Sequence, residues 1–190
     1  MKKNYEMDMC SGPILGKLLT FTIPLIFSGI LQLLFNAADV IVVGRFAGSQ
    51  SLAAVGSTTA LINLMINIFI GLSVGVNVIV ERYYGAKREK DVQDTIHTAM
   101  ALSIVSGLFL IIAGQLLSRP MLELMGTPDD VIDKSTIYMR IIFIGMPANM
   151  IYNFGSAILR AVGDTKRPLY FLTAAGVINV VLNLFFVIMF

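Results

Sequence analysis

The sequence predicts an all-α integral membrane protein, a bundle of five transmembrane helices, and three observations lead to that class. Hydrophobic residues make up 56% of the 190-residue chain and charged residues only 14%, against about 25% charged residues in an ordinary soluble domain. Five apolar segments each reach the roughly 20 residues that a helix needs to cross a bilayer. Their apolar residues do not alternate with period two, which argues against the strands of a membrane barrel.

The five predicted spans are separated by short connections that contain glycine, proline, serine or charged residues. We place the spans at about 18–43, 52–80, 96–117, 137–159 and 169–190. Residues 1–17 are predicted to form an N-terminal segment outside the membrane, and residues 18–190 a single transmembrane lobe. Because the chain ends at Phe190 inside an apolar run, we expect this lobe to be incomplete at its C-terminus. A cleavable signal peptide is the alternative for the first segment, but its apolar run exceeds the roughly 7–15 residues of such a peptide.

Orientation follows from lysine and arginine, which are enriched on the cytoplasmic side of membrane proteins. The side that holds the N-terminus carries most of them: Lys2, Lys3, Lys17, Arg82, Lys87, Arg88, Lys90, Arg160, Lys166 and Arg167. The other side carries Arg45, Arg119, Lys134 and Arg140. We therefore expect a multi-pass protein of the plasma (inner) membrane with a cytoplasmic N-terminus.

Several function classes are disfavoured by composition and motifs. The net charge of +2 is too small, and the basic residues too scattered, to indicate a nucleic-acid partner. A single cysteine, Cys10, permits neither an intramolecular disulfide nor a thiolate metal cluster. The sequence lacks GxxxxGK[ST] and HExxH motifs. We predict no enzyme, no bound metal and no cofactor.

The first span carries the only carboxylate inside any of the five apolar segments, Asp39. Ser28, Gln32 and Asn36 precede it at spacings that place all four residues along one side of a helix. A carboxylate at membrane depth costs about 2.5–3.5 kcal/mol on insertion scales, so it usually faces a partner or a water-filled path. The alternative is that Asp39, near the end of its span, simply reaches the headgroups or Arg45.

Three other spans also carry polar or small residues along one side. The second has Thr59, Asn63, Asn67, Gly71 and Gly75; the fourth Gly145, Asn149, Asn153 and Ser156; the fifth Gly176, Asn179 and Asn183. Small residues at this spacing permit close helix packing, which we predict for the row ending in Gly71 and Gly75. For Asn179 and Asn183, packing and function remain equally open, because each amide needs a partner in hydrocarbon.

Two prolines lie inside predicted spans. Pro24 removes a backbone hydrogen bond from the first span and predicts a kink there, where a gating motion could be absorbed. Pro147 in the fourth span has the same consequence. Proline is also simply more frequent in membrane helices than in soluble ones, which leaves a structural interpretation open.

Five segments together resemble the multidrug and toxic compound extrusion (MATE) family: FTIPLIFSGILQLLFNAADVIVVGRFAG (21–48), LAAVG (52–56), GLSVG (71–75), YYGAKREKD (83–91) and LRAVGDTKRPL (159–169). The resemblance runs over nearly the whole chain, and the last segment is its most specific motif. It implies the N-terminal part of a twelve-helix transporter built from two six-helix lobes. This chain would supply five helices of one lobe, with the C-terminal lobe as its partner.

The resemblance also implies a site. The acid of the first span belongs to the cation or proton site in the family, which corresponds to Asp39 here. Several members carry Asn-x-x-x-Asp in the fifth span, whereas this chain has Asn179 and Asn183, so only one carboxylate is expected. The coupling ion would be H⁺ or Na⁺. Gln32 and Asn36 are expected to line its cavity, with Asn149 and Asn153 toward substrate.

The leading hypothesis is therefore a cation-coupled antiporter that exports small organic cations or amphipathic toxic compounds across the lipid bilayer by alternating access. A lipid-linked oligosaccharide flippase of the same superfamily is an alternative, although it would need basic residues in its cavity and the span centres contain none. A non-transporting membrane scaffold, held together by its polar stripes, is another. A third is that the fragment by itself is inert.

Overall fold

The computed structural model describes residue 7, residues 12–46 and residues 48–189. They form six helices and, within that part of the chain, no strand: α1 (Ile14–Phe46), α2 (Gly48–Gly85), α3 (Glu89–Leu124), α4 (Asp129–Ile144), α5 (Met146–Ala161) and α6 (Lys166–Met189). The all-α prediction is confirmed. The predicted N-terminal segment 1–17 falls largely outside the described residues.

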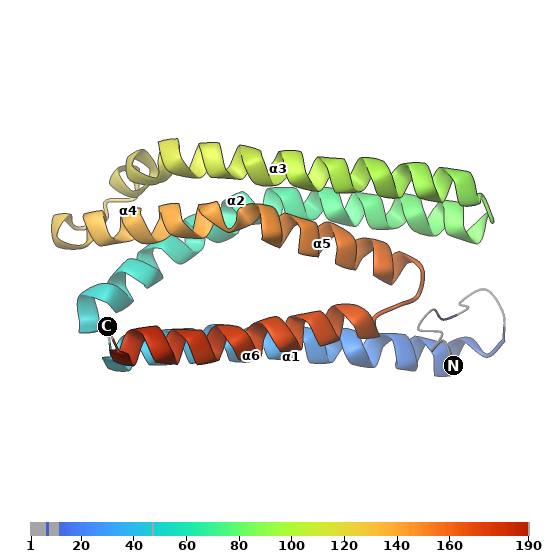
Figure 1. The fold of residues 1–190 in the computed structure, drawn as a ribbon, viewed down its shortest axis with the longest axis horizontal. Coiled ribbons are helices and arrows are strands. Elements are labelled where there is room, and N and C mark those ends of the chain that lie inside the picture. Colours follow the sequence, from blue (N-terminus) through green and yellow to red (C-terminus); the bar gives the residue numbers. More distant parts are fainter. Residues whose placement is uncertain (1–6, 8–11, 47, 190) are drawn as a thin grey trace.

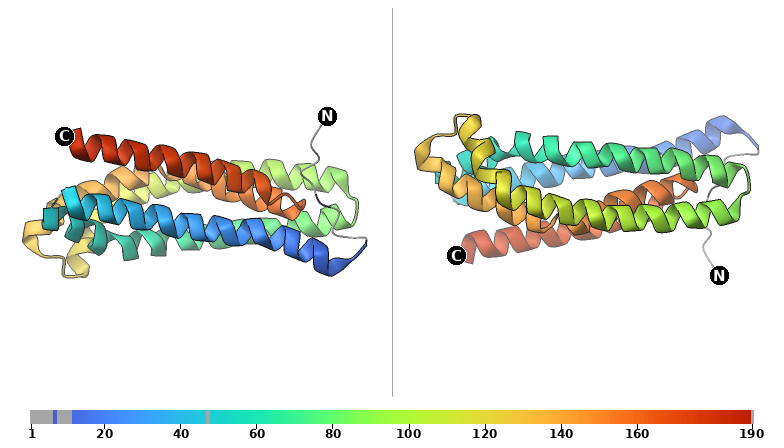
Figure 2. Two further views of the ribbon diagram at one scale, coloured as in Figure 1. Left: turned by 90° about the horizontal axis from the view of Figure 1, so that it is seen from below. Right: turned by 90° about the horizontal axis from the view of Figure 1, so that it is seen from above.

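The helices form two layers (Figure 1). The first is a four-helix bundle of α2, α3, α4 and α5, and the second is the pair α1 and α6, which run side by side in the same direction. The apolar core lies inside the four-helix bundle, where Leu110, Met139, Phe143 and Phe154 are fully buried. The pair is attached through contacts of α1 with α2 and of α6 with α5, and the views from below and above show how it lies along the bundle (Figure 2). Its helices are much less enclosed than the bundle.

Every long helix extends beyond the span predicted for it. The first three contain 33, 38 and 36 residues, which corresponds to roughly 50–57 Å of length, whereas the hydrocarbon core is about 30 Å thick. The connections between the helices are correspondingly shorter than predicted. For example, the connection between α2 and α3 consists of residues 86–88, whereas the sequence predicted a charged connection at 81–95. Hydropathy marks the part of a helix inside lipid, but backbone hydrogen bonds continue the helix into the charged interface.

The fourth predicted span, 137–159, is not one helix. Four helices are long and apolar enough to cross a membrane, and the bent pair α4 and α5 brings the total to five within the described part of the chain. The pair bends by 48° at Gly145, two residues before Pro147. Proline has no N–H for the carbonyl four residues earlier, so the helix is interrupted there. The kink expected from Pro147 is thus present as a break.

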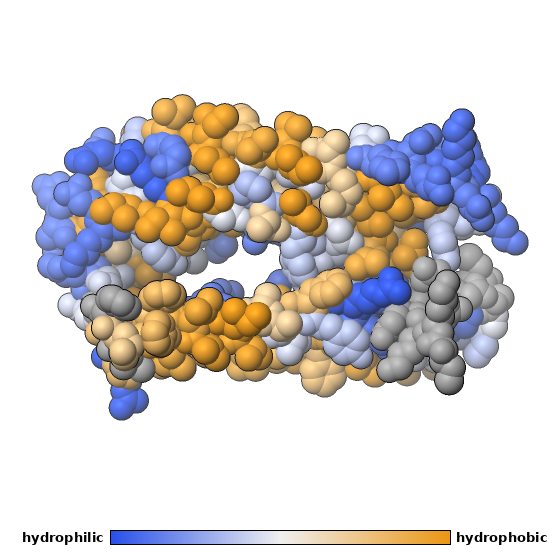
Figure 3. Space-filling model, viewed as in Figure 1, coloured by the Kyte–Doolittle hydropathy of each residue, from blue (hydrophilic) through white to orange (hydrophobic). Residues whose placement is uncertain are grey.

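The surface has the pattern of a membrane protein. Hydrophilic residues gather at both ends of the bundle and hydrophobic residues between them, and an opening passes between the two layers (Figure 3). In the most apolar window of α6 only 6% of residues are buried within the lobe, against 33% in α3. Large apolar side chains on α1 and α6 are exposed, including Leu33 at 71% and Val181 at 59%. Lipid or further protein must solvate these faces.

Gly107 of α3 shows how tightly the bundle is packed. A Cβ at this position would collide with the Cα of Pro147, a backbone atom, so the first turn of α5 would have to move. We expect Gly107→Ala to reduce the free energy of unfolding by about 1–3 kcal/mol through overpacking. Circular dichroism during titration of mixed micelles with dodecyl sulfate measures this change.

Gly71→Ala is the matched control, because a Cβ at Gly71 would meet no atom within 4 Å. There the higher helix propensity of alanine should leave stability unchanged or raise it by up to about 1 kcal/mol. Equal effects of the two substitutions would contradict the close contact of α3 with α5.

Candidate functional site

The acid singled out in the sequence meets both amides of the last helix. Asp39 on α1 is half-buried, and Nδ2 of Asn183 on α6 donates a hydrogen bond of 2.7 Å to its Oδ1. The Asn179 amide faces the same carboxylate, with its nitrogen 3.0 Å from Oδ1 and 3.3 Å from Oδ2 of Asp39 when it is oriented as a donor. Residues far apart in the chain thus form one polar cluster between two helices.

The side-chain amide of Asn179 has two possible orientations, which differ in whether its nitrogen or its oxygen faces Asp39. With the nitrogen toward Asp39, both asparagines stabilise an ionised carboxylate. With the amide reversed, its oxygen would face the two carboxylate oxygens, an arrangement that is repulsive unless a proton or a cation lies between them. We therefore assign the donor orientation to Asn179.

Local packing holds this cluster in register. Because α1 and α6 run in the same direction, residues near the end of each lie at the same depth. One turn before Asp39, the ring of Phe35 lies directly over Gly176 of α6, where a Cβ would overlap it. Gly176, Asn179 and Asn183 share one side of α6 by their spacing. The glycine allows the close approach, and the two amides follow at the level of Asp39.

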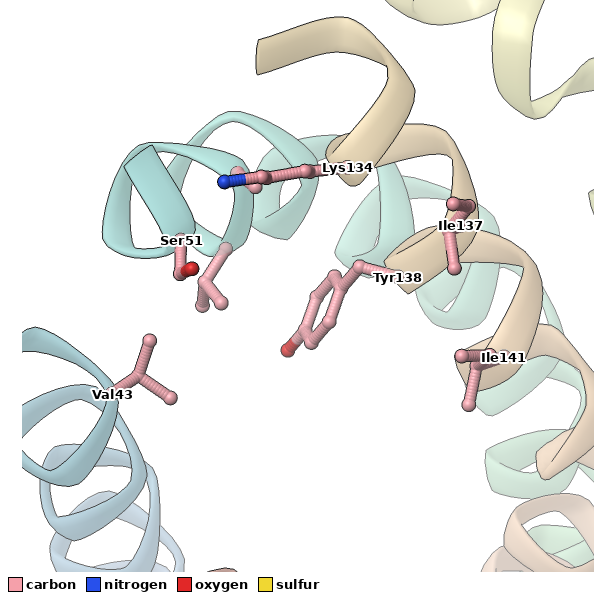
Figure 4. A pocket seen from close by; sticks show the side chains of 8 residues that line it. Val43, Ser51, Lys134, Ile137, Tyr138 and Ile141 are labelled. Atoms are coloured by element: carbon pink, nitrogen blue, oxygen red, sulfur yellow. The ribbon is translucent and has the colours of Figure 1, made fainter. Parts of the chain in front are cut away.

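Tyr138 of α4, which the sequence analysis missed, lines a cavity that Val43 of α1 also lines. Its hydroxyl group points into this cavity, which has a volume of about 340 Å³ (Figure 4). Val43, one turn beyond Asp39 on α1, lines the same cavity together with Ser51 and Lys134. The ammonium group of Lys134 donates a 2.9 Å hydrogen bond to Oε1 of Gln50. An isolated tyrosine gives no signal in the sequence, because its position depends on how the two layers of helices lie relative to each other.

The other predicted site residues are placed differently. Gln32 and Asn36 are exposed, and no described residue is a hydrogen-bond partner for either side chain. Asn153 Nδ2 donates to the backbone oxygen of Asn149 at 2.9 Å and to its Oδ1 at 2.7 Å. Asn153 also lines a separate cavity between α1, α2 and α5. The two asparagine pairs therefore occupy different places, and of the four asparagines only Asn179 and Asn183 contact Asp39.

Pro24 lies within α1, which the structure assigns as one helix through this position. Ser28, one turn later, donates from its Oγ to the carbonyl oxygen of Pro24 at 2.8 Å, and both residues are buried. Its predicted role as a gating kink stays a prediction. The clear break in a span lies instead at Gly145.

A second buried acid, Asp164, precedes α6. Its Oδ1 accepts hydrogen bonds from the backbone N–H groups of Lys166 and Arg167, each at 3.1 Å, which is the arrangement of a helix N-cap. Its Oδ2 lies 3.1 Å from Nε of Arg167 as an ion pair without hydrogen-bond geometry. Asp164 has no exposed surface. It anchors the beginning of the helix that presents Asn179 and Asn183.

At Asp39, one carboxylate lies between two side-chain amides, and such groups can take up a proton or coordinate a cation. The described residues contain no group of three or more His, Cys, Asp or Glu side chains that could hold a metal ion. One carboxylate and two amides supply oxygen ligands, which hard cations prefer. A single negative charge at this depth suits an ion that arrives and leaves.

The family model MatE matches residues 24–185. The chain belongs to the MatE family. This agrees with the resemblance to MATE transporters in its motifs, and its relatives are transporters rather than enzymes. It is 35% identical to a probable multidrug resistance protein of Bacillus subtilis, YoeA, over 85% of this chain and 35% of that protein. YpnP, another probable multidrug resistance protein of Bacillus subtilis, is 30% identical over 96% of this chain and 41% of its own length.

Solved MATE structures share the fold of this MatE lobe. A MATE transporter in its bent conformation and in its straight conformation each superposes with a TM-score of 0.81, at 26% sequence identity, over 88% of this chain and 37% of the solved chain. This MatE chain spans 35% and 41% of the lengths of the two curated relatives. It corresponds to one part of a longer transporter architecture.

Proposed function

We propose that this MatE chain is the N-terminal lobe of a cation-coupled antiporter, and that Asp39, Asn179 and Asn183 bind the coupling ion. The observation that carries the proposal is the half-buried carboxylate that joins α1 to α6 through the two amides of α6. A group that can be charged or neutral, placed at the contact of two helices, changes the interaction between them when it binds an ion.

The proposed step begins with an ionised Asp39 held by two amide donors. When H⁺ binds, the neutral carboxyl group donates a hydrogen bond and the Asn179 amide reverses to accept it. When Na⁺ binds instead, the reversed amide supplies an oxygen ligand beside the carboxylate. Either event replaces the charge-assisted hydrogen bond from Asn179 to Asp39 with a different contact between α6 and α1. Gating by α1 at Pro24 then follows as part of the proposal.

The proposed direction and substrates rest on the relatives and the charge distribution. Two relatives carry multidrug resistance names, so we infer export of cationic or amphipathic small molecules. The basic residues at the N-terminal end of the lobe favour a cytoplasmic location for that end, with Asp39 near the outer face. Uptake of the ion from outside would then drive the change of state. The C-terminal lobe would close the substrate path by alternating access.

Reconstitution tests this function directly. We expect the complete transporter that contains this lobe, in liposomes, to move ethidium only when an inward gradient of H⁺ or Na⁺ is imposed. Separate gradients, with valinomycin and potassium to clamp the voltage, identify the ion. Ethidium movement that is independent of both gradients would refute the antiporter. Movement of a lipid-linked pyrophosphate between leaflets without a gradient would favour the flippase instead.

A further inference from the structure

A cavity of about 230 Å³ with both apolar and charged lining residues lies far from Asp39, between the N-terminal half of α1 and the facing sides of α2 and α5. Phe21 lies on its α1 wall and Glu81 and Arg160 at its charged end, while the amides of Asn77 and Asn153 contribute further polar groups. Phe21 and Asp39 are separated along α1 by about 27 Å of helical rise. This cavity is therefore distinct from the coupling-ion cluster.

The two charged residues that line this cavity do not form an ion pair with each other. Glu81 and Arg160 line the same cavity, yet neither forms an ion pair with the other or with any other described residue. Nε of Arg160 is buried and lacks a hydrogen-bond acceptor among the described residues. Arg160 lines the cavity without an ion-pair partner among the described residues, so an anionic group of a ligand would be favoured beside its guanidinium group. The guanidinium group matches a carboxylate or phosphate in shape and charge.

The rest of the lining offers acceptors and apolar surface. Asn77 uses its Nδ2 to donate a 2.9 Å hydrogen bond to the carbonyl oxygen of Ala157, and thereby ties α2 to α5. Its amide oxygen and that of Asn153 accept no hydrogen bond within the described part of the chain. The Glu81 carboxylate is a further acceptor. The apolar side is covered by Phe21, Leu25 and Val74.

We propose that this cavity binds a small amphoteric molecule with an apolar body, whose acidic group meets Arg160 and whose ammonium group meets Glu81. The volume is below the roughly 300–1,000 Å³ of pockets for drug-sized ligands, so the ligand has the size of an amino acid. A second cavity of about 290 Å³ shares Phe21, Glu81 and Arg160. If the ligand of this cavity takes part in export, that role rests on the proposed function. Binding of the ligand in the cavity does not depend on the proposed function.

Free L-tryptophan is a suitable probe, because the chain contains no tryptophan and the ligand's fluorescence polarisation reports binding without background. Tryptamine lacks the carboxylate, and indole-3-propionate lacks the ammonium group. With the 190-residue chain in neutral detergent micelles, and empty micelles as the blank, we expect tryptophan to bind about tenfold or more tightly than either. Equal affinities for the three probes on the unaltered chain would overturn the proposal without any substitution.

Substitutions locate the site. Arg160→Gln should weaken tryptophan binding about tenfold and abolish its advantage over tryptamine, while Arg160→Lys should retain part of it. Arg82→Gln is the matched control, since Arg82 is an exposed arginine of α2 next to Glu81, and should leave all affinities unchanged. Tryptophan binding that survives Arg160→Gln but is lost in Asp39→Asn would place the probe at the ion cluster and overturn the proposal. Failure of gradient-driven ethidium transport would leave the binding result intact, so the two proposals fail separately.

Discussion

Asp39→Asn should abolish cation-driven efflux. Asparagine nearly matches aspartate in size, so the α1 contact with Asn183 is retained in shape while the group that takes up H⁺ or Na⁺ is lost. In liposomes with the complete transporter, we expect gradient-driven ethidium flux to fall at least about tenfold, to the level of protein-free liposomes. Because an amide neither binds a transported proton nor carries charge, the loss should hold for both ions.

Two controls separate coupling from folding in this experiment. Asp94→Asn removes an exposed acid at the N-terminal end of α3 whose side chain bonds no described residue, and it should transport normally. Asp39→Glu keeps the charge but lengthens the side chain, so partial activity is expected. If Asp39→Asn transported ethidium at the unaltered rate under either gradient, Asp39 would have no part in coupling.

Asp164→Ala should be among the most destabilising substitutions in this lobe. It removes an N-cap and leaves two backbone N–H groups, those of Lys166 and Arg167, without their acceptor in a buried setting. We expect the free energy of unfolding to fall by about 2–4 kcal/mol, from the lost cap together with the unsatisfied donors. Titration of mixed micelles with dodecyl sulfate, followed by circular dichroism, measures the change.

The Asp164→Asn variant distinguishes the contribution of the helix N-cap to stability from that of the negative charge. Asparagine is also a good N-cap and keeps the acceptor, but it loses the ion pair with Arg167, whose side chain is 42% exposed. Water compensates a partly exposed guanidinium, so this loss should be only about 1 kcal/mol or less. If the alanine and asparagine variants were equally stable, Asp164 would not act as the cap of α6.

Part of the candidate site was accessible from the sequence and part was not. The spacing of Gly176, Asn179 and Asn183 placed these residues on one side of a helix, and the cost of an acid in lipid singled out Asp39. Their meeting could not be derived from spacing, because it depends on α1 and α6 running in parallel at the same depth. The family resemblance supplied that pairing. Tyr138 and Arg160 gave no periodic signal, since each reaches its neighbours only through the crossing of helices.

The prediction of helix packing also depended on tertiary structure that the spacing of residues does not reveal. The small-residue row in α2 predicted close packing, but a Cβ added at Gly71 or Gly75 would meet no atom within 4 Å, and both residues are exposed within this lobe. That prediction is wrong for contacts inside the lobe. Within the four-helix bundle, tight contacts are made instead by Gly107 of α3 against Pro147 and by Gly114 against Phe143. Spacing identifies a face that can pack, but it does not say which helix arrives there.

The sequence by itself determined the membrane class, the five apolar spans and the two positions, Asp39 and Pro147, where a span departs from a plain apolar helix. These follow from local chemistry, since hydropathy, charge and the missing N–H of proline act within a few residues. The tertiary structure decided the geometry in which Asp39 meets Asn183, and it alone showed that Asp164 is buried and that Arg160 and Glu81 line one cavity. Such contacts join residues far apart in the chain, and their geometry is set by how whole helices pack.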